Sequence, residues 1–296
     1  MELFEEVAEQ AATGDMARLY LDIRRTLRVP IVNLLYRVWA TEGRALELLW
    51  GVARPNLQTI DFEAKADSLR CEAVEKITYD VAVPSELSRI ANLKLGAADM
   101  AQLRRELDLF HYVNSKLLLH CAVLNKALGW RGYAGTGRAL GAIELGIAPH
   151  MPKEIVLVDL QSAAPDVRQL LEKIRSRLNL AVLNSDYRAL AKWPGYLQLA
   201  WEDLGSYLDS EYHDAHERHL RHYALELVSG LPYPARITDE DLRRSGAGSG
   251  RLAQLVEPFL ELLPGLILNI AFWKIALDGA EEAKKSPFSV EAVARA

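Results

Sequence analysis

Asn184-Ser185-Asp186-Tyr187-Arg188 has a counterpart 151 positions earlier in the chain, Asn33-Leu34-Leu35-Tyr36-Arg37. Asparagine, tyrosine and arginine occupy the same places in both segments, whereas Ser185-Asp186 stands where the first copy has Leu34-Leu35. The shared residues indicate a common structural role, because both copies keep them. The single acid of the later copy marks that copy as the candidate for chemistry.

The similarity extends beyond these five positions. When residues 19–50 are aligned with residues 170–201 without gaps, chance would give about two identities, and the chain has several times that number. Looser similarity follows at shifts of 152 and 149. The identical pairs are Leu19/Leu170, Ile23/Ile174, Arg24/Arg175, Leu27/Leu178, Asn33/Asn184, Tyr36/Tyr187, Arg37/Arg188, Ala40/Ala191, Leu46/Leu197, Leu48/Leu199 and Trp50/Trp201.

This internal repeat predicts two similar helical halves that pack as a pseudo-dimer. Its period is too long for a solenoid of many units. Equivalent positions of two such halves face each other across a pseudo-twofold axis, and an interface of this kind is a natural place for a pocket. We expect a first repeat over residues 1–128, a glycine- and proline-rich linker over residues 129–158 and a second repeat over residues 159–296, together forming one compact unit.

Apolar residues recur at helical spacing through most of the chain, which predicts an all-α fold. We expect one helix to end before Pro55 and another to bend at Pro264-Gly265, because proline removes a helical hydrogen bond. The glycines between Gly129 and Gly146 predict a flexible crossing, with a short helix near residues 140–145. Residues 155–158 are the strand candidate.

Composition argues against several classes of function. The 296 residues are 50% hydrophobic and 25% charged, and the net charge of −5 gives no basic footprint for nucleic acid. The most apolar run, residues 262–273, is shorter than the roughly 20 residues that span a bilayer, which favours a buried helix and no membrane partner. Two cysteines make no disulfide framework, and the acidic first residues do not resemble a signal peptide. These features favour a cytoplasmic protein.

Asp186 is the candidate general base. If its surroundings are as apolar as the Leu34-Leu35 of the first copy, desolvation raises the carboxyl pKa toward the range that a general base needs. The competing interpretation is that Ser185 and Asp186 cap a helix at a solvated turn. Position in the sequence leaves the two interpretations equal.

Thr59 and Glu63 lie four residues apart near the start of an expected helix and therefore share one face. Glu63 could reach a hydroxyl group or a water molecule held by Thr59. A solvated face is the simpler interpretation, because Asp61 and Lys65 lie beside them.

His213, His216, His219 and His222 suggest a metal site at first sight. Side chains three residues apart on a helix are rotated by about 60° from one another, so four of them cannot converge. Charged neighbours crowd the same stretch. This favours a solvated helix, and we expect no metal.

A polar island interrupts the long helical run of residues 97–128. It consists of His111, Tyr112, Asn114 and Ser115, and an apolar stretch follows it. Such an island either lines a cavity or makes hydrogen bonds inside the core. Both interpretations stay open, and the chain has no nucleotide-binding or nucleophile-elbow motif.

These residues resemble the group I, DL-type 2-haloacid dehalogenases, and the resemblance runs nearly end to end. It is carried by residues 22–30, by Ser185-Asp186 with Ala189-Leu190-Ala191 and Trp193-Pro194, and by Tyr112, Asn114 and Lys116. Gly230-Leu231-Pro232, residues 278–281 and residues 285–288 add to it. The resemblance implies an all-α fold of two pseudo-repeated halves with the active site between them.

The resemblance also implies a reaction. In that family an aspartate activates a water molecule that attacks C2 directly, and halide leaves with inversion and without an ester intermediate. Asp186 matches that aspartate, with Ser185 beside it, and Thr59 and Glu63 match a threonine and a glutamate implicated in catalysis. The Ser185 hydroxyl and backbone N–H groups at a helix start are candidate donors to the substrate carboxylate.

The sequence departs from the family pattern at three expected pocket positions. Ile31 and Leu34 stand where members often have aromatic residues, and His111 stands where they have asparagine. With Ser185, Tyr112 and Asn114, these residues make up the expected substrate-binding set. The departures bear on substrate size and on the range of enantiomers accepted.

We therefore expect a cofactor-independent hydrolase of short 2-haloalkanoic acids, with Asp186, Thr59 and Glu63 as catalytic residues and a homodimer as a possible assembly. Two alternatives remain open. One is a different reaction on a small carboxylic acid in the same pocket, with His111 taking part. The other is a non-catalytic helical binding or scaffold protein.

Overall fold

The computed structural model describes residues 5–129 and 132–290. Within those ranges it contains helices and no strand, and its β contacts are two isolated bridges, Thr59–Ala142 and Tyr133–Ala235. The expected all-α class is confirmed. The strand expected at residues 155–158 does not form, and residues 140–145 are not helical.

The helices fall into two groups along the described chain. The first group is α1 (Gly14–Leu27), α2 (Leu34–Trp39), α3 (Ala45–Leu57), α4 (Ile60–Asp80), α5 (Leu87–Ile90) and α6 (Ala97–Leu128), with short 3-10 turns at Glu9–Ala11 and Ala91–Leu93. The second group is α7 (Pro165–Arg177), α8 (Ser185–Leu190), α9 (Pro194–Leu208), α10 (Glu211–Val228), α11 (Asp239–Ser245), α12 (Ser249–Asp278) and α13 (Ala280–Lys284).

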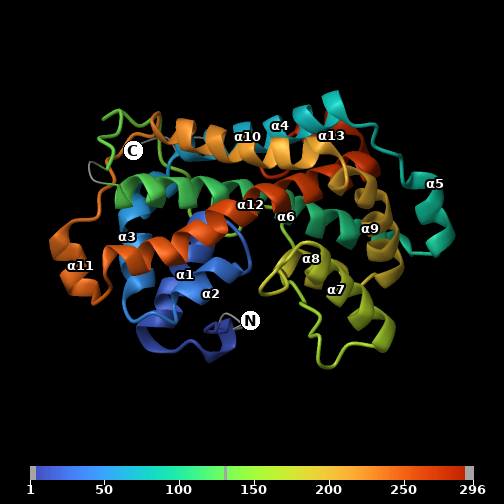
Figure 1. Ribbon diagram of the computed structural model, residues 1–296, viewed down its shortest axis with the longest axis horizontal. Coiled ribbons are helices and arrows are strands. Elements are labelled where there is room, and N and C mark those ends of the chain that lie inside the picture. Colours follow the sequence, from blue (N-terminus) through green and yellow to red (C-terminus); the bar gives the residue numbers. More distant parts are fainter. Residues whose placement is uncertain (1–4, 130–131, 291–296) are drawn as a thin grey trace.

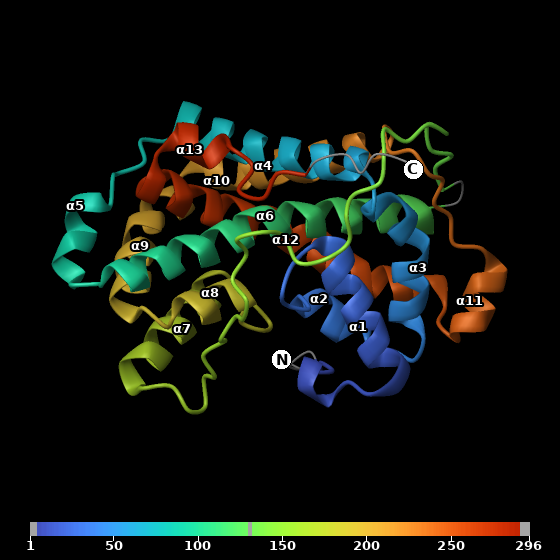
Figure 2. The same cartoon turned by 180° about the vertical axis from the view of Figure 1, so that it is seen from behind.

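Two long helices, α6 and α12, form the centre of the molecule. They lie side by side and run in opposite directions (Figures 1 and 2). Helices α4, α10 and α13 cover one side of this pair. On the other side, α1, α2 and α3 gather at one end and α7, α8 and α9 at the other, with α11 beside α3 and α5 near α9.

Helix α12 is long and apolar enough to cross a membrane by length and composition alone, but 78% of its most apolar window is buried inside the protein. Burial of apolar surface on this scale is the main stabilising contribution to a fold. Tryptophans fix the helix on both sides. Trp39 Nε1 donates to Leu255 O at 2.8 Å, and Trp273 Nε1 donates to Ala200 O at 2.8 Å. The expected buried helix is confirmed.

Pro55 does not end its helix where the sequence predicted. Helix α3 continues through Pro55 to Leu57, and α12 contains both Pro258 and Pro264 within one continuous element. Proline removes one backbone hydrogen bond, and burial of the surrounding apolar residues outweighs that local loss.

The glycine-rich segment follows a path set by backbone hydrogen bonds. Ile60 N donates to Gly141 O at 3.0 Å, Gly146 N donates to Arg25 O at 2.9 Å, and Val158 N donates to Arg188 O at 3.1 Å. The segment therefore runs along the first group of helices and then reaches α8. At Gly135, with φ of +73°, a Cβ atom would lie 2.5 Å from Pro232 O, so glycine is required there.

Candidate active site

Asp186 lies in the first turn of the six-residue helix α8. The chain enters this helix from Asn184 in an extended conformation, with φ −66° and ψ 156°. Helix α8 ends at Leu190, and α9 begins at Pro194, where proline is tolerated at the first helical position. This short helix carries Asp186 to the side of α6.

Burial decides between the two interpretations of Asp186. The residue is only 4% exposed, and Asn114 Nδ2 on α6 donates to its Oδ1 at 2.6 Å. Burial raises the pKa of the Asp186 carboxyl to about 6, and the hydrogen bond from Asn114 opposes part of that rise. The solvated turn is wrong, and the desolvated carboxyl is confirmed.

Polar atoms without partners surround the start of α8. Ser185 Oγ and Asn184 Oδ1 are buried and have no hydrogen-bond partner in the described part of the chain. Buried polar atoms in native proteins are nearly always paired with protein groups or ordered water. The start of α8 is therefore a place where a water molecule or a polar ligand is expected.

The opposite face of α6 carries a second polar network. The Lys116 ammonium pairs with the Glu63 carboxylate, and Tyr112 OH donates to Glu63 Oε2 at 3.1 Å. Lys116 also donates to Leu27 O at 3.0 Å, and Arg28 Nη1 donates to Tyr112 OH at 3.3 Å. All of these side chains are buried, and burial lowers the pKa of Lys116 to about 8 against the opposing effect of Glu63.

Helical geometry separates the two networks. Asn114 and Lys116 are two residues apart on α6. Each residue turns the helix by roughly 100°, so their side chains point in directions about 160° apart. No hydrogen bond among the described residues joins Glu63 or Tyr112 to Asp186. Ser185 and Asn114 therefore lie with Asp186, whereas Tyr112 lies with Glu63.

Thr59 is the N-cap of α4. Its Oγ1 accepts from Phe62 N at 3.1 Å and donates to Asn56 O at 2.7 Å, which are the bonds of a helix cap. The side chain of Glu63 points to Lys116 and Tyr112 instead of the Thr59 hydroxyl. Thr59 and Glu63 are both 2% exposed, so the solvated face is wrong.

His111 is also buried, at 2% exposure, and its Nε2 donates to Ala283 O at 2.9 Å. Burial and the neighbouring Arg70 guanidinium lower the pKa of His111 to about 3. The imidazole is therefore neutral at physiological pH and adds no charge to a pocket. Its Nδ1 has no partner among the described residues.

Ile31 and Leu34 line two different hollows. Ile31 contributes to a groove of about 560 Å³ that Arg24, Arg37 and Arg188 also line. Leu34 contributes to a smaller apolar cavity of about 160 Å³ between α2, the loop before α8 and α12. Phe259, Leu262, Leu180 and Val182 are among its other walls.

The histidines of α10 are only partly solvated. His213 and His216 are 6% and 4% exposed, whereas His222 lies at the surface. His216 contacts Tyr207 OH at 2.9 Å and Asp80 Oδ2 at 3.0 Å. The expectation of a fully solvated helix is wrong, because α10 packs against α4, α6 and α12 and its first two histidines lie on the packed side.

Two important residues had little signal in the sequence alone. Lys116 stood out only through the family resemblance, although a charge inside an apolar helical stretch implies a buried partner. Asn269, whose Nδ2 donates to Tyr187 OH at 2.9 Å, was not singled out. Its signal is a lone amide in the most apolar run of the chain.

Comparisons with known proteins give a consistent picture. Residues 30–187 match a protein-family model described as halocarboxylic acid dehydrogenase DehI. The chain is 31% identical over 294 residues to a configuration-inverting 2-haloacid dehalogenase of Alcaligenes xylosoxydans xylosoxydans, covering 97% of this chain and 98% of that one. It is 26% identical to an (R)-2-haloacid dehalogenase of Pseudomonas putida, covering 92% of each. A solved D-2-haloacid dehalogenase mutant in complex with D-2-CPA superposes with a TM-score of 0.84 at 25% identity, over 92% of this chain and 95% of that one.

Proposed function

The chain belongs to the DehI family, which its match over residues 30–187 and its end-to-end relatives establish, and on this basis we propose that it hydrolyses short 2-haloalkanoic acids to 2-hydroxy acids. It is a hydrolase acting on carbon–halide bonds. Its reaction inverts the configuration at C2, as the name of the Alcaligenes relative states for that enzyme. The alternatives of a different His111-dependent reaction and of a scaffold protein are not favoured.

One observation carries the proposed mechanism: the buried Asp186 carboxyl, held by Asn114, lies beside the unpartnered Ser185 hydroxyl. A carboxyl with a pKa of about 6 is ionised at neutral pH and is still basic enough to take a proton from water during attack. The oxygen of that water forms the new bond to C2 while the carbon–halogen bond breaks. Halide leaves with the bonding electrons, and Asp186 returns the proton to solvent.

We propose that the substrate carboxylate is held at the start of α8. The Ser185 hydroxyl and the backbone N–H groups of the first turn are donors at that place, and donors to an anion are what the substrate requires. Arg188 of α8 also lines the groove of about 560 Å³, together with Arg37, which pairs with Glu6.

We propose that Leu34 bounds the space for the substrate side chain and halogen, and that Ile31 lines the separate groove through which the substrate approaches. Leu34 occupies the place in α2 that Ser185 occupies in α8, and it lines the apolar cavity of about 160 Å³. Apolar walls exclude bulk water, which strengthens the electrostatic interactions of Asp186. A cavity of this size suits a short side chain.

Thr59 and Glu63 are proposed to act as positioning residues. Thr59 caps α4. Glu63, also on α4, pairs with Lys116 and accepts from Tyr112, both on the face of α6 that points away from Asp186. The near face of the same helix carries Asn114, which fixes the orientation of the Asp186 carboxyl. In this proposal the family's threonine and glutamate support the base instead of touching the reacting atoms.

We also propose that residues 1–128 and 159–296 are duplicated halves joined by the linker at residues 129–158. Support comes from helices that begin at matching positions: α4 at Ile60 and α10 at Glu211, 151 residues apart. Buried tyrosines make equivalent contacts as well. Tyr36 OH lies 2.8 Å from His120 Nδ1, and Tyr187 OH accepts from Asn269 at 2.9 Å.

The test is halide release from D- and L-2-chloropropionate by the full chain. The proposal expects release that yields lactate of inverted configuration, measured by chiral chromatography. A single turnover in ¹⁸O-labelled water should place the label in the product hydroxyl and none in the protein. Label in the protein would show an ester on a carboxylate and would rule out direct attack by water.

A further inference from the structure

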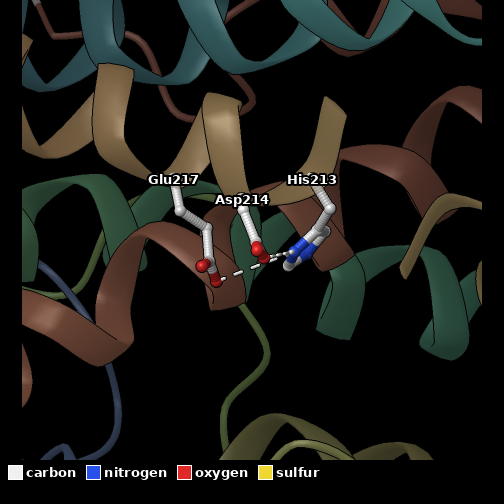
Figure 3. A group of neighbouring side chains, drawn as sticks. All are labelled: His213, Asp214 and Glu217. Carbon is white, nitrogen blue, oxygen red and sulfur yellow. Dashed lines mark ion pairs between the residues drawn. The ribbon is translucent and has the colours of Figure 1, made fainter. Parts of the chain in front are cut away.

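Three side chains of α10 converge on one side of the helix, outside the proposed active site. They are His213, Asp214 and Glu217 (Figure 3). His213 Nδ1 lies 4.0 Å from Asp214 Oδ1 and 3.8 Å from Glu217 Oε1. One nitrogen and two oxygens at this spacing make up a donor set that divalent transition cations accept.

The His213 imidazole is held in the tautomer that a metal ligand needs. The residue is 6% exposed, and its Nε2 lies 3.3 Å from Asn269 Oδ1. The amide of Asn269 donates its Nδ2 to Tyr187 OH, so its Oδ1 is the acceptor and His213 Nε2 carries the proton. The Nδ1 lone pair is then free, points toward the two carboxylates and makes no hydrogen bond within the described chain. A hydrogen bond from the ring nitrogen that does not bind the metal commonly orients a metal-binding histidine.

Space is available next to the donors. A cavity of about 240 Å³ is lined by His213, Glu217, Glu261 and Gly265, among others. Gly265 leaves the wall open toward Glu217, because a Cβ atom there would lie 2.3 Å from Glu217 Oε1. The cavity can hold water molecules that complete the coordination of an ion.

The first group of helices holds a cation at the corresponding place. Tyr36 aligns with Tyr187, and its partner His120 aligns with Asn269, the partner of Tyr187. In the same alignment, Asp214 corresponds to Glu63 and Gly265 corresponds to Lys116. The Lys116 ammonium neutralises Glu63 in the first group. In the second group glycine replaces the lysine, and the carboxylates remain without an equivalent ammonium.

Glu217 has no ion-pair partner among the lysines and arginines of the described residues, and Arg221 pairs with Glu261. Asp214 and Glu261 place negative charge beside Glu217, and Arg218 and Arg221 offset it in part. A bound cation would offset the remaining repulsion.

We propose that His213, Asp214 and Glu217 form a binding site for a divalent transition cation of the Zn²⁺ type, with the remaining coordination positions open to water in the adjoining cavity. Ligand atoms 2.0–2.1 Å from a tetrahedral zinc ion lie about 3.3 Å apart. The three ligand atoms lie within 4.8 Å of one another, so the side chains reach that spacing with movements on the order of 1 Å, which rotamer adjustment supplies.

The experiment is titration of the chelator-treated full chain with Zn²⁺ by isothermal calorimetry, and with Co²⁺ by visible absorption, which reports coordination by histidine and carboxylate. The site predicts saturable binding of one ion per chain. Glu217→Gln should weaken that binding at least tenfold. Asn269→Leu should weaken it by roughly 10–100-fold, because His213 Nε2 loses its hydrogen-bond acceptor. The metal-free melting temperature of each variant establishes that it is folded.

His222→Gln is the matched control. His222 Nε2 lies 3.1 Å from Glu226 Oε1, also four residues along α10, but both side chains are exposed and no third donor joins them. The control should bind Zn²⁺ as the unaltered chain does. Absence of saturable binding up to millimolar Zn²⁺, or binding that His222→Gln removes and Glu217→Gln leaves intact, would overturn the proposal.

Discussion

Asp186→Asn is expected to abolish catalysis and at the same time stabilise the fold. The substitution keeps the shape of the side chain, and an amide oxygen at this position still accepts the hydrogen bond from Asn114 that the carboxylate accepts at 2.6 Å. It removes both the base and a charge that is buried at 4% exposure. The two effects therefore separate loss of chemistry from loss of structure.

The size of the stabilisation follows from the pKa of Asp186. Burial raises it from 3.8 to about 6, a difference of about 2 units, and each unit corresponds to about 1.4 kcal/mol. Because the pKa is raised in the folded state, the folded protein retains this proton to higher pH than the unfolded chain. The unaltered protein therefore loses stability between about pH 4 and pH 6, and the loss is constant above that window. Asp186→Asn should be more stable by about 3 kcal/mol at pH 8 and equally stable below pH 4.

Urea denaturation of both proteins at pH 4 and pH 8 measures this difference, and halide release from 2-chloropropionate measures activity. Product formation by the variant at a rate near that of the unaltered chain would refute the assignment of Asp186 as base. A variant less stable at pH 8 than the unaltered chain would refute the desolvation argument, because it would mean that the ionised carboxylate stabilises the fold.

Three further predictions test the surroundings of the base. Asn114→Leu removes the bond that opposes the rise in the Asp186 pKa, so the acidic limb of the pH–rate profile should move above pH 6; an unmoved limb would contradict the assignment. Glu63→Gln leaves the buried Lys116 ammonium unpaired and should lower the free energy of unfolding by about 3 kcal/mol or more. Adding Lys116→Met should recover part of that loss in denaturation experiments, and a purely additive result would exclude the pair. Leu34→Ala enlarges the cavity of about 160 Å³ and should lower the KM for 2-haloacids with longer side chains relative to 2-chloropropionate; equal KM ratios would place Leu34 outside the pocket.

The sequence predicted the helical class and singled out the proposed base, Asp186, because both depend on local pattern. Apolar periodicity defines each helix without knowledge of its neighbours. Asp186 stood out because the earlier copy of its segment has Leu35 at the same place. The comparison of two segments within one chain supplied information that a single segment lacks.

Tertiary partners could not be predicted in the same way. Glu63 and Lys116 are 53 residues apart, and their pairing depends on the rotation of α4 against α6. The spacing of Asn114 and Lys116 along α6 places them on opposite faces, which separates Glu63 from Asp186. That spacing gave no information about which elements the two faces meet.

Local rules also failed where packing outweighed them. Pro55 was expected to end a helix and instead lies inside α3. His213 and His216 were expected in solvent, although α10 packs against α12 and buries both. In each place the deciding interaction comes from a residue far away in the sequence.

Early and late segments of the chain pack against each other, and this has a consequence for biosynthesis. Arg89 of α5 pairs with Asp203 on α9, Glu86 N donates to Ala276 O at 3.0 Å, and Trp39 donates to Leu255 O. Segments made early are thus completed only by segments made last. While the ribosome still holds residues beyond Leu255, the face of α6 that packs against α12 has no native cover, although α3, α4 and α10 also pack on α6, and a nascent chain in that state is exposed to aggregation.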